Sequence, residues 1–166
     1  MMGKRSNFKR RKHDAYQTPP SAVTPLLPHI EGHVWFAEPC VGEGRLRNEL
    51  VAQGHVCTFQ GDIETGQDAL EFEAIDCEYI ITNPPWSRSL LHPMIEHFRM
   101  QRPTWLLFDA DWAHTKQAVP YLPYCHKIVS VGRVSWMENG TSGKDNCAWY
   151  LFDRDPAVTV FEGRAA

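Results

Sequence analysis

Residues 33–62 read HVWFAEPCVGEGRLRNELVAQGHVCTFQGD, and this stretch decides the fold. The apolar run at His33–Glu38 is typical of a buried strand, and Arg45–Gln53 has the periodicity of an amphipathic helix that ends at Gly54. His55–Gln60 alternates and is rich in strand-forming residues, which predicts a second strand. A strand, a glycine turn, a helix and a strand in this order predict a parallel βαβ unit with a right-handed crossover.

More segments of both kinds follow. We expect further strands over Glu78–Thr82, Thr104–Asp109, Lys127–Val131 and Cys147–Phe152. We expect further helices over Thr18–Leu27, Ser89–Gln101 and Trp112–Val119. The loop between the last two strands contains Gly140 and Gly143, which suits an antiparallel pair. The order of elements predicts an α/β domain with a mostly parallel twisted sheet, an antiparallel final strand and helices on both faces.

Composition limits the class of protein. A chain of 166 residues, 43% of them hydrophobic, fits one globular domain. It contains no apolar stretch of about 20 residues and no signal-peptide core, so we expect a cytoplasmic protein with no membrane partner. The eight histidines show no metal spacing, so no metal site is expected. The cysteines form no C-x-x-C pair and are expected to be free and mostly buried: Cys40, Cys57, Cys77, Cys125 and Cys147.

Charge is distributed unevenly along the chain, whose net charge is −3. The first twelve residues carry no acidic side chain and six basic ones, namely Lys4, Arg5, Lys9, Arg10, Arg11 and Lys12. The remainder has 11 basic and 20 acidic residues. We expect residues 1–13 to be a basic disordered arm, serving either to contact nucleic-acid phosphates or as a solubilising tail. Residues 14–166 are then the folded domain.

The segment Asn83-Pro84-Pro85-Trp86 directly follows the third expected strand. Neither proline can continue a sheet, so the strand must end in a rigid turn, at the edge where open α/β sheets keep their ligands. The Asn83 amide and the carbonyls beside the prolines suit an amino group, and the Trp86 ring suits a heteroaromatic base. The alternative interpretation is a proline-rich turn whose tryptophan packs into the core.

The turn after the first strand reads Glu38-Pro39-Cys40-Val41-Gly42-Glu43-Gly44. Glycines there let a ligand approach the backbone next to a helix N-terminus. The dinucleotide fingerprint is not matched, because Arg47 stands at the third glycine position, and Glu38 suits a positively charged ligand better than a pyrophosphate. Asp62, at the end of the second strand, is expected to accept ribose hydroxyls. By itself such a turn is more often a tight loop than a ligand site, and its pairing with Asp62 and the N-P-P-W segment is what favours a site.

Taken together, these motifs carry a resemblance. The segments D-A-Y-Q-T-P-P, E-P-C-V-G-E-G-R-L, G-D-I to Q-D-A-L-E-F and N-P-P-W, with the later R-V-S-W and D-N-C-A-W-Y-L-F, span residues 14–153. In this order they resemble class I S-adenosylmethionine-dependent methyltransferases, specifically the small adenine-N6 DNA methyltransferases of phages and prophages. The resemblance implies the Rossmann-like class I methyltransferase fold and S-adenosylmethionine as cofactor. No large segment of the chain resembles a target-recognition domain, so we expect a single methyltransferase domain without a separate one.

The resemblance also implies roles for individual residues. The implied cofactor-binding residues are Tyr16, Thr18, Pro19, Glu38, Pro39, Cys40, Gly42, Gly44, Asp62, Asp68 and Asn83. Of these, Tyr16, Thr18 and Pro19 would line the methionine end, and Asp68 would meet the adenine amino group. The implied catalytic residues are Asn83, Pro84, Pro85 and Trp86, which would hold the target amine and stack on its base. Cys40 stands where the family often has phenylalanine or alanine.

The expected reaction is in-line methyl transfer to N6 of a flipped or unpaired adenine in DNA. Arg88 and Lys144, on loops, are expected to meet phosphates together with the arm. Three alternatives remain open: an adenine methyltransferase on RNA, a glutamine-N5 protein methyltransferase, and a non-catalytic nucleic-acid-binding regulator with this fold. The basic arm and Trp86 favour a nucleic-acid substrate over glutamine.

Overall fold

The computed structural model describes residues 17–137 and 143–166. In this part of the chain seven strands form one sheet in the order β2-β1-β3-β4-β6-β5-β7. Their bounds are β1 Trp35–Glu38, β2 Val56–Gln60, β3 Tyr79–Thr82, β4 Thr104–Asp109, β5 Cys125–Arg133, β6 Asn146–Phe152 and β7 Val160–Glu162. Strands β1 to β4 pair in parallel, β6 lies antiparallel between β4 and β5, and β7 is parallel to β5. The antiparallel strand predicted over Cys147–Phe152 is thereby confirmed as β6.

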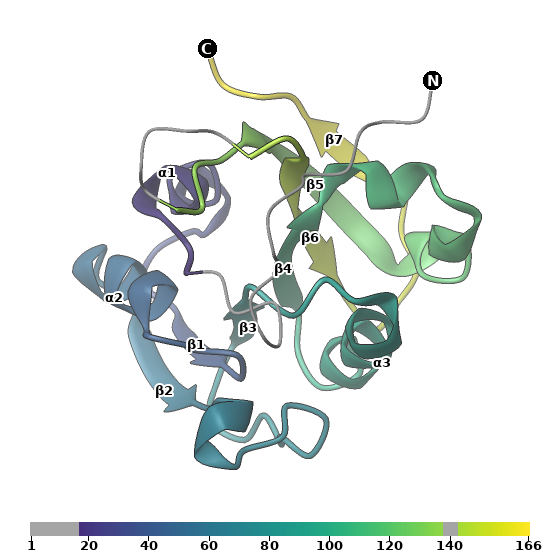
Figure 1. Ribbon diagram of the computed structural model, residues 1–166. Coiled ribbons are helices and arrows are strands. Elements are labelled where there is room, and N and C mark those ends of the chain that lie inside the picture. Colours follow the sequence, from purple (N-terminus) through teal and green to yellow (C-terminus); the bar gives the residue numbers. More distant parts are fainter. Residues whose placement is uncertain (1–16, 138–142) are drawn as a thin grey trace.

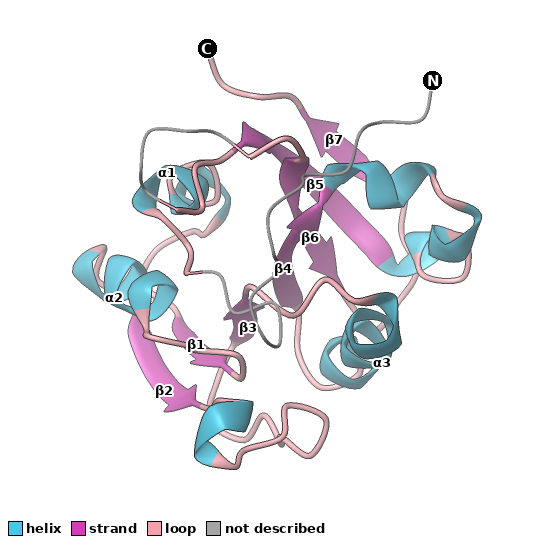
Figure 2. Ribbon diagram, in the orientation of Figure 1, coloured by secondary structure: helices cyan, strands magenta, loops and turns pink. Residues whose placement is uncertain are grey.

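Helices cover both faces of the sheet, as predicted. Figure 1 shows α1 (Pro20–Val23) and α2 (Arg45–Ala52) on one side and α3 (Arg88–Arg99) on the other, and Figure 2 shows the strands between them. The central strand β4 explains this arrangement, because its side chains alternate between two buried clusters. Trp105 and Leu107 pack on the α2 side, whereas Leu106 and Phe108 pack on the α3 side. A strand with two buried faces reads in the sequence as a continuous apolar run.

One buried hydrogen bond fixes the start of the described chain. The indole N–H of Trp149, on β6, donates to the carbonyl of Ala22 in α1 at 2.8 Å. Both groups are buried, so losing this bond would cost about 1–3 kcal/mol. It anchors α1 to the sheet and therefore fixes where the residues just before α1 lie.

Two predicted helices differ from the structure. The helix expected from Thr18 spans only four residues, with Pro19 at its N-cap, and Leu27–His29 form a separate 3₁₀ turn. The helix expected over Trp112–Val119 was wrong: Ala110–His114 and Lys116–Ala118 are 3₁₀ turns separated by Thr115. Thr115 has extended backbone angles and its hydroxyl donates to the Trp112 carbonyl, which stops helix propagation.

The two ends of the sheet were the hardest parts to predict. Between β2 and β3 the chain forms a 3₁₀ turn at Ile63–Thr65 and then a loop. Strand β2 lies at one edge of the sheet. At the other edge, β7 has three exposed residues, and this strand was not predicted although it overlaps a run of strand-forming residues, Val158–Phe161. Gly140 lies outside the described residues.

Several expectations from composition can be compared with the structure. All five cysteines are free, three of them buried and two, Cys40 and Cys57, half-buried. Within residues 17–137 and 143–166, no cluster of three or more histidine, cysteine or acidic side chains could hold a metal ion. The helices of this part of the chain are all too short or too polar to cross a membrane.

Candidate active site

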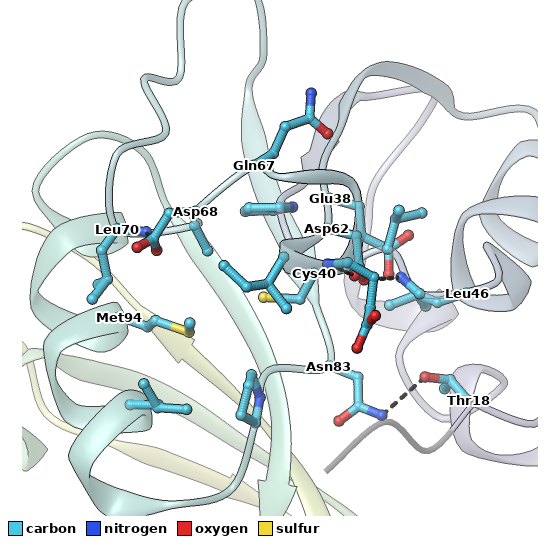
Figure 3. A pocket seen from close by; sticks show the side chains of 18 of the residues that line it. Thr18, Glu38, Cys40, Leu46, Asp62, Gln67, Asp68, Leu70, Asn83 and Met94 are labelled. Atoms are coloured by element: carbon cyan, nitrogen blue, oxygen red, sulfur yellow. Dashed lines mark hydrogen bonds between the residues drawn. The ribbon is translucent and has the colours of Figure 1, made fainter. Parts of the chain in front are cut away.

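The carboxyl ends of β1, β2 and β3 meet around a cavity of ≈ 320 Å³. A cavity of this size is ordinary for a small-molecule site. Figure 3 shows side chains facing it from both sides, namely Asp68, Leu70 and Met94 on one and Glu38, Asp62 and Leu46 on the other. The structure brings these predicted site residues together in its wall: Thr18, Glu38, Pro39, Cys40, Gly42, Asp62, Asp68, Asn83 and Pro85.

The glycine turn after β1 is shaped by two left-handed residues. Gly42 has φ 54° and Gly44, the N-cap of α2, has φ 82°, a region that favours glycine. A Cβ at Gly42 would lie 2.9 Å from the side-chain nitrogen of Gln17, so the Gln17 side chain would have to move if residue 42 were not glycine. Gly42 lines the cavity, while Gly44 is buried behind it and starts the helix.

The Asp62 carboxylate holds the glycine turn after β1 against the end of β2 through hydrogen bonds. Its Oδ2 accepts the Gly42 N–H at 2.8 Å, and its Oδ1 accepts the Glu64 N–H at 2.8 Å. The neighbouring Val41 N–H donates to the Gly61 carbonyl at 2.8 Å. Sequence reasoning gave Asp62 only a ligand role, whereas in the structure its carboxylate also holds the glycine turn in place.

Glu38 is a buried acid at the cavity. It ends β1, only 1% of its surface is exposed, and its Oε2 has no hydrogen-bond partner among the described residues. Burial raises the pKa of Glu38 well above its usual value, and the charge and backbone N–H of Arg47 oppose that rise. An acid held in this way suits a cationic ligand that would supply the missing partner.

The opposite wall combines a carboxylate with apolar groups. Asp68 is exposed to the cavity, and its Oδ1 accepts the Leu70 N–H at 2.9 Å, which fixes the turn. Leu90 and Met94 of α3 complete this wall.

Burial raises the pKa of Cys40 to about 12, so its thiol stays neutral and adds no charge to the site.

Asn83 follows β3 and has its amide held on both sides. Its Nδ2 donates to Thr18 Oγ1 at 3.1 Å, and its Oδ1 accepts the indole N–H of Trp86 at 3.2 Å. An indole N–H only donates, so the amide oxygen must be the atom that faces it. The two contacts together fix how the carboxamide of Asn83 is oriented at the cavity.

Trp86 does not line the cavity itself. Its ring is half-buried beside Asn83, and its N–H also reaches the carbonyl of Leu107 at 3.2 Å. The ring of Trp136 meets it edge-on, with centroids 5.6 Å apart and an interplanar angle of 87°. Trp86 therefore has one edge anchored to β4 while it packs against both buried clusters.

The remaining predicted residues lie outside the cavity. Pro19, Gly44 and Pro84 are buried just behind its wall. Arg88 forms an ion pair with Asp109 at 3.1 Å, and Lys144 is exposed on the connection between β5 and β6. Tyr16 and the arm residues Lys4, Arg5, Lys9, Arg10, Arg11 and Lys12 lie outside the described residues.

Sequence reasoning missed ten residues of the wall: Gln17, Val41, Leu46, Ile63, Glu64, Gln67, Ala69, Leu70, Leu90 and Met94. Gln17 accepts the Glu43 N–H at 3.1 Å, and its position next to Thr18 was the available signal. Leu90 and Met94 belong to the apolar positions of the helix expected over Ser89–Gln101. Their i, i+4 spacing is equally what one wall of a cavity requires.

The sheet order, the antiparallel β6 and the cavity at the strand ends define the Rossmann-like fold of class I methyltransferases. A proposed RNA methyltransferase from Pyrococcus horikoshii matches with a TM-score of 0.59 and 16% identity, over 92% of this chain and 93% of that one. The 23S rRNA methyltransferase ErmE matches with a TM-score of 0.54 and 13% identity, over 85% and 70%.

A third match is the methyltransferase subunit of a type I restriction-modification system from Streptococcus thermophilus. Its TM-score is 0.50 and its identity 8%, over 90% of this chain and 47% of that one. No protein-family model and no curated protein sequence matches the chain. At such low identities the similarity is one of fold, so the function must be argued from the site.

Proposed function

We propose that this protein transfers a methyl group from S-adenosylmethionine to the N6 amino group of adenine in DNA. The observation that carries the proposal is the carboxamide of Asn83, fixed by Thr18 and Trp86 at the wall of a cavity lined with acids. An amide oxygen at that place is suited to accept an N–H of a planar amine.

The residues of the cavity fit the cofactor. When bound, S-adenosylmethionine supplies the methyl group on a positively charged sulfur. Glu38, with its unpartnered buried oxygen, would hold the ammonium group, and Asp62 would accept ribose hydroxyls. Asp68 would accept from the adenine amino group, and Gly42 leaves room at the backbone. Thr18, Pro39 and Cys40 would form the remaining contacts, with Tyr16, Pro19 and Gly44 supporting them.

The N-P-P-W segment would supply the acceptors that make the target amine nucleophilic. The lone pair of an adenine amine is delocalised into its ring, so acceptors that draw both N–H bonds out of plane favour attack by the nitrogen. The Asn83 amide oxygen and the Pro84 carbonyl are the acceptors we assign to this role, with Pro85 fixing the turn. Most of the rate then comes from positioning and preorganised dipoles.

The target base must leave its stack to reach Asn83. Flipping costs a few kcal/mol and is cheapest for an unpaired base. We assign Trp86 to stack on the base, which would recover about 1–3 kcal/mol. The basic arm and Lys144 would contact the phosphates.

RNA is the second candidate substrate. Two structural neighbours are described as RNA methyltransferases, whereas the third is described as the methyltransferase subunit of a type I restriction-modification system. The resemblance of the N-P-P-W segment and its flanking motifs to phage DNA methyltransferases makes DNA the first choice.

Methyl transfer assays test the proposal directly. Tritiated S-adenosylmethionine is offered with single-stranded DNA, duplex DNA and RNA, and the product nucleosides are separated by mass spectrometry. N6-methyldeoxyadenosine is the expected product. Asn83→Ala should abolish turnover but keep cofactor affinity by calorimetry, while Asn48→Ala, on the exposed side of α2, should behave as wild type. Transfer to RNA alone, or to none of the three, would overturn the DNA assignment.

A further inference from the structure

Trp86 is held by contacts on more than its indole edge. Its backbone carbonyl accepts from Nη1 of Arg88 at 3.3 Å. Its indole N–H, as described above, is shared between Asn83 Oδ1 and the Leu107 carbonyl. Each of these contacts bears on where the ring stands relative to the Asn83 amide.

Arg88 is held in turn at the end of the neighbouring strand. Its Nη2 lies 3.1 Å from Oδ2 of Asp109, the last residue of β4, and the two side chains are 30% and 25% exposed. Asp109 is itself fixed, because its Oδ1 accepts the Asp111 N–H at 2.9 Å and its carbonyl accepts the Tyr150 hydroxyl at 2.9 Å. Burial raises the pKa of Tyr150, so this hydroxyl stays protonated and able to donate.

The guanidinium thus bridges the segment after β3 to the end of β4. A guanidinium is planar and presents its donors in a rigid fork, so it fixes two acceptors relative to one another. An ammonium group is a single point of charge and cannot fix both acceptors at once. The bridge therefore depends on arginine at residue 88 and on a carboxylate at residue 109.

We propose that Arg88 and Asp109 are positioning residues that set the placement of Trp86 and, through its indole N–H, of the Asn83 amide. The inference rests on the proposed function, because Asn83 is the group that meets the substrate amine there. It replaces the phosphate contact that the sequence suggested for Arg88 with a role inside the protein. A misplacement of about 1 Å near reacting atoms can cost about 100-fold in rate.

The test uses Arg88→Lys and Asp109→Asn in the full chain. Both should lower kcat by about 10- to 100-fold, with KM for single-stranded DNA and the calorimetric Kd for S-adenosylmethionine within about threefold of wild type. The double variant should lose no more than the worse single one, since both remove one bridge. Glu96→Gln is the matched control, because it removes the carboxylate paired with another arginine of α3, Arg99, and should leave kcat unchanged.

A second readout does not depend on activity. In a ¹⁵N-labelled protein the indole resonance of Trp86, assigned with Trp86→Phe, should shift in Arg88→Lys and Asp109→Asn by more than that of Trp35, Trp105 or Trp149. An unshifted Trp86 resonance would overturn the inference, as would a shift without any loss of kcat. A raised KM with a shallower salt dependence and unchanged kcat would instead make Arg88 a phosphate contact. If the wild type transferred no methyl group, the proposed function would be refuted. The shift of the Trp86 indole resonance would then be the measurement that tests whether Arg88 and Asp109 position Trp86.

Discussion

The indole Nε1 of Trp86 lies 3.2 Å from Oδ1 of Asn83, and it reaches the Leu107 carbonyl at the same distance. One N–H thus joins the residue assigned to the substrate amine to the strand that supports it. The aromatic face of Trp86 and its donor edge therefore have separate tasks, stacking and positioning, and separate substitutions can remove them.

Trp86→Phe keeps a ring but removes the donor. We expect kcat to fall by about 2- to 10-fold, the equivalent of one neutral hydrogen bond, with cofactor affinity unchanged. Trp86→Ala also removes the stacking face, so its kcat should fall further than that of Trp86→Phe. Steady-state kinetics check both, with Trp35→Phe, an exposed tryptophan at the opposite end of the sheet, as control. Wild-type kcat in both Trp86 variants would refute the assigned roles.

Thr18 holds the other side of the same amide. Its Oγ1 accepts from Asn83 Nδ2 at 3.1 Å, across 65 positions of sequence. Thr18→Val keeps the shape but removes the acceptor, so single-turnover rates should fall by about 2- to 10-fold. Thr18→Ser keeps the hydroxyl and should stay close to wild type. Equal rates in the two variants would show that this hydrogen bond does not position the amide.

The buried carboxyl of Glu38 predicts a pH dependence of stability. Because burial raises its pKa above the ordinary 4.5, the folded state binds its proton more tightly than the unfolded state does. Its contribution to stability is therefore complete below pH 4.5 and is lost as the pH rises through the folded-state pKa. The loss is about 1.4 kcal/mol for each unit by which the pKa is raised.

Urea unfolding of the cofactor-free protein at a series of pH values measures this effect. Wild type should lose stability relative to Glu38→Gln as the pH rises from 4.5. Glu43→Gln, which changes an exposed acid of the same turn, should run parallel to wild type. Parallel curves for wild type and Glu38→Gln would contradict a raised pKa in the folded state.

Much of the fold was predictable from local patterns. The βαβ unit, β3, α3 and β4 each carry a period or an apolar run, and glycines or prolines mark their ends. Segments without an apolar period were not predictable. The 3₁₀ turns after β4 depend on the hydrogen bonds of Asp109 and Thr115. The short strand β7 is a different case, because it overlaps the strand-forming run Val158–Phe161 and its pairing with β5 was missed.

The candidate site, like the fold, has features that the sequence predicts and features that it does not. Motifs identified the residues that line its two glycine- and proline-containing turns, because their chemistry is local. The contacts that fix them join distant positions, such as Thr18 with Asn83 and Arg88 with Asp109. Propensity and periodicity say nothing about such pairs. Gln17 was missed for this reason, since only the folded chain sets it against Gly42.

Gly42 and Gly32 allow the effects of backbone conformation and of space to be separated. Both have positive φ, 54° and 68°, but a Cβ at Gly42 would meet the Gln17 amide at 2.9 Å, whereas none of the described atoms lies within 4 Å of one at Gly32. Gly32→Ala should therefore cost about 1 kcal/mol in the free energy of unfolding, from conformation alone.

Gly42→Ala should cost more, and it should also weaken S-adenosylmethionine binding, because Gln17 or the turn must shift. In a Gln17→Ala background, adding Gly42→Ala should therefore cost only about as much stability as Gly32→Ala costs in wild type, as measured by urea unfolding and calorimetry. If Gly42→Ala alone already matched Gly32→Ala in both measurements, the close approach of Gln17 to the turn would have no part in shaping the site.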